Sequence, residues 1–222
     1  MGIIKNGILG TVVNKVGAVV GKKIRGQNVI TGISRGSNKR ESSDQLEQQF
    51  RFGLLSKFLM THGGLIESGF KRKARQQSAM TTAYHYNYPN AFLVQEKIAG
   101  ESEKPFSERI KLDYAALCYS VGPIQGPNCG RVVRNADATC TFSWLDYPQS
   151  RDSQNTDRAG CLIWDASTGR AYYLVDVGLR GSLGFDVDIS FLPTDVELHF
   201  YMHFINASTK VWGDSVYLGS TL

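Results

Sequence analysis

The chain has 222 residues, which is long enough to bury a hydrophobic core without disulfides or bound metals. Its formal net charge of +5 is unevenly distributed, because residues 1–75 carry 14 Lys and Arg against four acids while the remainder carries a net charge of −5. Lysines keep every N-terminal apolar run well below the ~18 residues of a membrane span, so we expect no transmembrane helix there.

The chain opens with MGIIKNGILGTVVNKVGAVVGKKIRGQNVITG, a stretch rich in glycine and β-branched residues. Interrupting lysines also exclude the continuous apolar region of a secretory signal. We therefore expect synthesis in the cytoplasm, and the final location, a virion or other assembled particle included, stays open.

The composition of residues 7–33 predicts short β-strands, with breaks at Asn14-Lys15 and at residues 25–28. The second break is typical of a hairpin turn, since Gly26 can adopt a positive φ at little cost. Two or three strands bury too little to be stable alone, so this segment must cover another surface. We expect that contact to be made by seven apolar residues: Val12, Val13, Val16, Val19, Val20, Val29 and Ile30.

After the polar connector at residues 34–40, the spacing of the apolar residues changes from that of strands to that of a helix. Leu46, Phe50, Leu54 and Phe58 recur every four residues, which predicts the apolar face of one amphipathic helix ending at Gly63-Gly64.

Residues 71–75, KRKAR, form the most basic run of the chain, and three tyrosines follow closely at Tyr84, Tyr86 and Tyr88. Clustered cations bind phosphates and aromatic rings stack on bases, so the region is a candidate nucleic-acid surface. The alternative is a solvated helix end followed by an alternating strand or loop. The candidate patch for nucleic acid or an acidic partner comprises Lys22, Lys23, Arg25, Lys71, Arg72, Lys73 and Arg75.

The chain becomes strand-rich from about Asp113. Six segments predict strands: residues 139–145, 160–164, 171–177, 183–191, 196–205 and 211–218. Their number and spacing are typical of an immunoglobulin-like or fibronectin-type β-sandwich, with Trp144 as its core aromatic residue. The predicted class is α+β, mainly β, with a β-rich assembly segment (1–40), a helical and basic connecting region (41–112) and the sandwich (113–222).

No pattern in the sequence indicates catalysis, a cofactor or a metal. His199 and His203 would stand ~13 Å apart on one strand, too far to share an ion, and they alternate out of phase with the apolar set. We therefore expect them to be solvated or at an edge. Asp186 and Asp188 share a strand face, as polar strand residues commonly do. The four cysteines form no C-x-x-C pair, which argues against a zinc site. Disulfides would need an oxidising compartment, and without a targeting signal we expect buried free thiols.

Ordered motifs along nearly the whole chain resemble one family. They are MGIIKNGILG, KVGAVVGKKIRGQNVITG, QLEQQFRFGLLSKFL, IESGF, NAFL, DYAALCYSVG, FSWLD and SVYLG. The chain resembles an uncharacterised Bacteroidota family known as a domain of unknown function, and more loosely it resembles phage-derived structural proteins. Such a family has no established activity or catalytic residues, so the resemblance transfers none to this chain.

Three functions are compatible with these features. The leading hypothesis is a non-enzymatic structural protein, a self-assembling subunit of a virion-, tail- or fibre-like assembly, whose N-terminal segment adds a strand to another copy or another subunit. The alternative is a nucleic-acid-binding protein that uses the basic first third. The third is a protein- or carbohydrate-binding module whose sandwich loops, near residues 150–155 and 167–169, hold the ligand. Trp164 and Trp212 are candidate stacking residues for it, although core positions are favoured for both.

Overall fold

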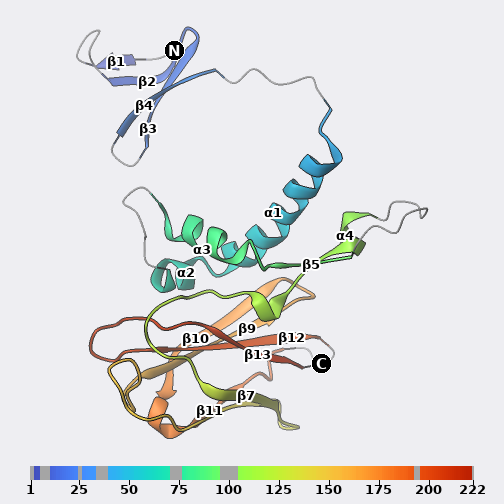
Figure 1. Cartoon of the computed structure of the whole chain (residues 1–222), viewed down its shortest axis with the longest axis vertical. Helices are drawn as coiled ribbons and strands as arrows, with labels where there is room; N and C mark the ends of the chain where they lie inside the picture. The colour runs from blue at the N-terminus through green and yellow to red at the C-terminus, as the bar shows by residue number, and fades with distance from the viewer. Residues whose placement is uncertain are drawn as a thin grey trace. The chain divides into compact units, whose positions relative to one another are not determined.

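The computed structural model describes residues 3–5, 11–24, 27–33, 40–70, 77–95, 105–192 and 196–221, with side chains from residue 14 onward. The chain divides into two compact units, which we call the N-terminal unit (1–43) and the C-terminal unit (44–222) (Figure 1).

The N-terminal unit is a four-stranded antiparallel sheet rather than a lone hairpin. Its strands follow chain order: β1 (Ile3–Lys5), β2 (Thr11–Val16), β3 (Val19–Ile24) and β4 (Gln27–Gly32). The predicted break at Asn14-Lys15 is wrong, because β2 continues through both residues and Asn14 takes a φ of 67°, a conformation that asparagine tolerates. The chain turns instead after Val16, where Gly17 has a φ of 57°.

In the described ranges, four α-helices precede or flank the sandwich: α1 (Ser43–Thr61), α2 (Gly63–Gly69), α3 (Ala79–Asn87) and α4 (Phe106–Arg109). Two short 3-10 helices, η1 (Tyr114–Ala116) and η2 (Arg180–Ser182), lie further along the chain. The predicted amphipathic helix is α1, and Phe58 of its stripe is fully buried while Leu46 in its first turn remains 41% exposed. Ser78 caps α3 by accepting a hydrogen bond from the Thr81 amide at 3.1 Å. Strand β5 (Phe92–Val94) pairs antiparallel with β6 (Ile110–Leu112), and α4 precedes β6 directly. None of the helices in the described part of the chain is long and apolar enough to span a membrane.

The C-terminal unit contains the predicted sandwich of two antiparallel sheets, which is immunoglobulin-like. One sheet has the order β10-β9-β12-β13, formed by β10 (Arg170–Leu179), β9 (Arg158–Asp165), β12 (Leu198–Ile205) and β13 (Val216–Thr221). The other has the order β11-β8-β7, formed by β11 (Gly184–Asp188), β8 (Thr139–Leu145) and β7 (Asn128–Arg134). Strand β7 was not among the predicted segments.

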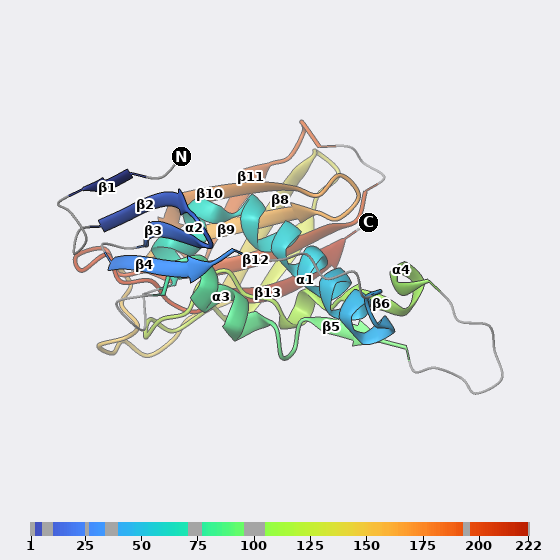
Figure 2. The same ribbon diagram turned by 90° about the horizontal axis from the view of Figure 1, so that it is seen from above.

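The helices cover the outer face of the four-stranded sheet, so the C-terminal unit has three layers (Figures 1 and 2). Strand β12 is buried along its whole length, so one of its faces packs against the other sheet and the opposite face packs against the helical layer. Phe200 and Phe204 face the other sheet, where Trp144 is 5% exposed as predicted, while Tyr201 packs with Phe58 and Trp164 in the core beneath the helices. Each sheet face of β12 therefore belongs to a different core.

A close approach between β9 and β12 leads to the first prediction. A Cβ atom on Gly160 would lie 2.4 Å from Cε1 of His203, whose ring is fully buried. Gly160→Ala should therefore lower the free energy of unfolding by ~1–3 kcal/mol, as overpacked core sites do. Urea denaturation measures this, with Gly53→Ala as the matched control, because a Cβ there meets nothing within 4 Å and alanine favours the α1 helix. Equal stability of the two variants would contradict the packing at Gly160.

Candidate functional site

The predicted assembly contact lies on the N-terminal sheet, but its members do not share one face. Side chains alternate along a strand, and Val19 pairs with Gly32 while Val20 pairs with Thr31. Val19 and Ile30 therefore lie on one face and Val20 and Val29 on the other. Val16 pairs with Val19 and shares its face, while Val12 and Val13 lie in β2, whose side chains before Asn14 fall outside the described residues.

Among the side chains that the structure describes in this sheet, neither face forms a continuous apolar surface. Val19, Val20 and Val29 are half-buried, and Ile30 is 59% exposed. Lys22 and Lys23 project from opposite faces among these apolar residues, and both are exposed. Docking through a face would bury one of these cations, which is costly without a partner. The edge of the sheet is a better candidate for contact than either face.

Strand β4 is the terminal strand of this sheet, and its hydrogen-bond pattern identifies its outward groups. The Ile33 amide donates to the Ala18 carbonyl at 3.0 Å, so alternate residues along β4, starting with Thr31, also face β3. The backbone N–H and C=O groups of Ile30 and Gly32 therefore point to the outer edge, which pairs with no other strand of the described chain.

The structure does not bring the predicted basic patch together as one described surface. Lys22 and Lys23 face opposite sides of the N-terminal sheet. Arg25 and residues 71–75 lie outside the described residues.

Tyr84 and Tyr86 lie on α3, and Tyr88 directly follows the helix at its C-terminus, so none of the three tyrosines lies on a strand. Tyr84 and Tyr88 pack on each other at 5.3 Å between ring centroids, and Tyr84 also contacts Phe52 of α1 at 5.0 Å. Tyr86 packs edge-on against Phe70 and stays 49% exposed. Two of the three rings therefore join α3 to its neighbours instead of forming a platform for bases.

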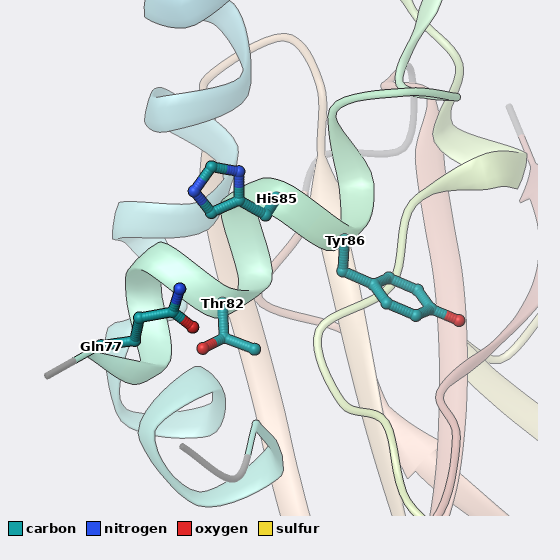
Figure 3. Close-up of a pocket in the computed structure, with 4 residues that line it drawn as sticks. All are labelled: Gln77, Thr82, His85 and Tyr86. Atoms are coloured by element: carbon teal, nitrogen blue, oxygen red, sulfur yellow. The ribbon is translucent and has the colours of Figure 1, made fainter. Parts of the chain in front are cut away.

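A pocket of about 510 Å³ lies beside α3 (Figure 3). Its described lining comprises Gln77, Thr82, His85 and Tyr86. The Thr82 hydroxyl donates to the Ser78 carbonyl at 3.1 Å. Among these four described side chains, no hydrogen bond joins one to another, so the geometry does not define a nucleophile and its base.

The prediction that His199 and His203 are solvated or at an edge is wrong. Strand β12 is a central strand, and the face opposite the sandwich core is covered by the helices and by the chain around Tyr114 and Tyr119. His203 is fully buried, stacks on Trp212 at 4.5 Å and is hydrogen-bonded through Nδ1 with the Tyr119 hydroxyl at 2.7 Å. His199 stacks on Tyr114 at 3.9 Å.

A third buried histidine lies on the helical side of the same interface. His62, which follows α1, stacks on Trp164 at 5.2 Å, and its Nδ1–H donates to the Phe58 carbonyl. Burial lowers the pKa of His62 to about 4 and that of His203 to about 3, and it also lowers the pKa of His199. These rings are therefore neutral packing elements at neutral pH.

A buried ion pair between Arg180 and Asp157 packs against Phe204 in the sandwich. The Arg180 Nε donates to Asp157 Oδ2 at 3.1 Å, and its guanidinium lies 3.8 Å from the centroid of the Phe204 ring. Arg180 Nη2 donates to the Gln125 carbonyl at 2.6 Å, and the Trp144 indole donates to the Arg180 carbonyl at 2.9 Å. The charges are matched and hydrogen-bonded, as buried structural pairs require. The sequence carries no local signal for a pair 23 residues apart.

The residues of the binding-module hypothesis are structural. Trp164 is 2% exposed, and Trp212 stacks on His203. The loop at 167–169 is folded around Asp165, which accepts hydrogen bonds from Ser167 and Thr168. Asp186 and Asp188 are exposed on β11, and in the described part of the chain no three His, Cys, Asp or Glu side chains are grouped to hold a metal ion.

The cysteines are free thiols. Cys118, Cys140 and Cys161 are buried, and Cys129 is exposed. Burial raises the pKa of Cys118 and of Cys161 to about 12, so these thiols are protonated and inert as nucleophiles at neutral pH.

These features define a mainly β protein with a helix-covered immunoglobulin-like sandwich and a separate N-terminal sheet. The chain belongs to the family of unknown function DUF6266, whose model matches residues 10–219. Among solved structures it is similar to the chicken CNTN1 FN1–FN3 domains at 12% identity and a TM-score of 0.35. That match covers 46% of this chain and 32% of the other, so the chain spans about a third of its length. The comparison with curated proteins finds no match.

The buried histidines predict that the protein loses stability in acid. Below pH ~6.5 the unfolded chain protonates His62 and His203, whereas the folded protein keeps both neutral until about pH 4 and 3. The free energy of unfolding should therefore fall as the pH falls from 6.5, by up to ~1.4 kcal/mol per pH unit for each ring. Urea denaturation between pH 7.5 and 5.5 measures the slope.

His203→Gln is the matched variant, since an amide can still bond with the Tyr119 hydroxyl but does not titrate. We expect a shallower pH dependence in this variant than in the wild type. An unchanged slope would show that His203 does not couple protonation to unfolding.

Proposed function

We propose that this protein is a non-enzymatic structural protein that self-assembles through its N-terminal sheet. The observation that carries the proposal is the outer edge of β4, where Ile30 and Gly32 direct backbone N–H and C=O groups outward. Exposed strand edges are templates for pairing with a strand of another chain. In this proposal the protein is a subunit of a virion-, tail- or fibre-like particle.

The burial in the N-terminal unit supports this proposal. Among the described residues with side chains in this sheet, Gly21 alone is buried, and Ile24 and Ile30 are 44% and 59% exposed. A sheet with so little burial gains stability when another strand or surface covers it.

The distribution of charge supports a partner with acidic groups. The N-terminal unit holds eight Lys and Arg against one acid, a net charge of +7, and the C-terminal unit holds a net charge of −2. Opposite charges favour encounter between the N-terminal unit of one copy and the C-terminal unit of another.

Replacement of Ile30 tests the proposal. Ile30→Pro removes an outward N–H without removing a bond to β3, whereas Ile30→Thr keeps the N–H and a β-branched side chain. We expect wild-type mass above the 24.6 kDa of one chain in size-exclusion chromatography with light scattering. The proline variant should associate about 5-fold more weakly than the threonine variant, or weaker still, since one lost hydrogen bond is worth about 1 kcal/mol. A wild-type protein that stays monomeric at every concentration would rule out self-assembly.

The net charge of +7 also favours the alternative, nucleic-acid binding, and salt separates the two functions. Cation–phosphate contacts weaken steeply with salt, whereas strand pairing is screened much less. We expect self-association to persist at a salt concentration that removes binding to labelled DNA and RNA. Tight binding at physiological salt that is lost in Lys22→Glu/Lys23→Glu, by a protein that is otherwise monomeric, would favour the nucleic-acid function instead.

A further inference from the structure

Strand β10 is a terminal strand of the helix-covered sheet, and its outward groups follow from the neighbouring ladder. The Ala166 amide donates to the Glu197 carbonyl at 3.4 Å, so alternate residues of β9, such as Trp164 and Leu162, face β12. The remaining β9 residues face β10, where Ile163 pairs with Tyr172. The backbone groups that point away from β9 therefore belong to Ala171, Tyr173 and Val175.

The regular part of this edge is short and well defined. The register between β10 and β9 is continuous from Arg170 to Val175 and shifts between Val175 and Gly178. Asp176 at the shift has a φ of 66° and forms an ion pair with Arg158 at 2.6 Å. Bulges of this kind interrupt pairing, so residues 170–175 form the usable edge, and β4 supplies a strand of the same six-residue length.

The side chains along this edge are apolar and open. Tyr173 is 51% exposed, Leu174 43% and Val175 44%, on both faces of the strand. No strand of the described chain pairs with this side of β10. A natural protein usually blunts such an edge with charged residues or proline, and residues 171–175 contain neither.

Charge distinguishes the two margins of the sandwich. Strands β10 and β11 lie side by side at one margin, where a Cβ on Gly178 would lie 3.7 Å from Phe185 (Figure 2). Asp186 and Asp188 on β11 make these two strands net acidic, with a charge of −2. Strands β7 and β13 at the other margin carry Arg131 and Arg134 and no acid, so the positively charged N-terminal unit is attracted to the β10 margin and repelled by the other.

We infer that the outer edge of β10 at residues 170–175 is the acceptor for β4 of a second copy of this chain. The inference rests on the proposed self-assembly and adds the acceptor to it. Pairing of two β4 strands with each other would bring together two units of net charge +7, whereas pairing of β4 with β10 joins opposite charges. Because donor and acceptor are different strands, the contact is heterologous and propagates head to tail.

Two blocked variants of the full-length chain test the acceptor. Tyr173→Pro removes an outward N–H from β10 and leaves its bonds to β9, and Tyr173→Thr is the matched control that keeps the N–H. At a protein concentration just sufficient for the wild type to assemble, we expect Tyr173→Pro and Ile30→Pro each to be mostly monomeric at 24.6 kDa. A 1:1 mixture of the two should form a capped dimer of twice that mass, since one variant keeps a free donor and the other a free acceptor. Circular dichroism and thermal unfolding confirm that each variant is folded.

A charge variant provides a second measurement if the proline variant does not fold. Tyr173→Lys places a cation on the exposed edge and should weaken self-association at least ~10-fold, whereas Tyr173→Glu should leave it equal or tighter. The difference in affinity between the two variants should disappear at high salt, because salt screens the introduced charges.

The outcomes separate the inference from the proposed function. Assembly of Tyr173→Pro like the wild type, with Ile30→Pro monomeric, would overturn β10 as the acceptor and leave self-assembly through β4 standing. A mixture that stays monomeric would also overturn the β4–β10 pairing. A wild type that stays monomeric would overturn both self-assembly through β4 and the role of β10 as its acceptor. Pairing of β4 with β10 within one chain would also give a monomer and counts as this outcome.

Discussion

Burial of β9 and β12 on both faces is the constraint on which the C-terminal unit depends. One face of β12 fills the sandwich with Phe200 and Phe204, and the other carries His199, Tyr201 and His203. A sandwich alone would leave that second face in water. The helices close it, and the partly polar rings are accommodated because each finds a flat aromatic neighbour and a hydroxyl or carbonyl partner. The helical layer is therefore part of the core and not a connection between domains.

The sequence predicted the sandwich because period-2 alternation identifies which residues share a strand face. Alternation cannot tell whether that face is covered, and for this reason the histidines of β12 were expected in solvent and are buried. Helix α3 was missed for a related reason, since Tyr84, Tyr86 and Tyr88 alternate like strand residues. The helix is specified instead by the Ser78 cap and by packing against α1, which depends on residues distant in the sequence.

The sequence identifies the apolar residues of the N-terminal sheet, but it does not show which face of the sheet each of them occupies. The seven apolar residues have their residue type in common, but the position of the turn at Gly17 decides which of them share a face. Because a shift of one residue exchanges the faces of a strand, this grouping needs the register, and the register comes from the ladder and not from composition. In the structure these apolar side chains are divided between the two faces of the sheet, whereas the outward backbone groups of β4 lie together on one edge.

The open edge of β10 is informative because the same strand is protected elsewhere. Its C-terminal half has the bulge at Asp176 and the ion pair with Arg158, and its neighbour β11 presents two carboxylates. Protection of this kind prevents indiscriminate pairing of strand edges. Its absence from residues 171–175, beside an acidic margin that favours a cationic strand, is the pattern expected of an edge that accepts one kind of partner and rejects others. An edge open along its whole length would risk aggregation, and one closed along its whole length could not assemble.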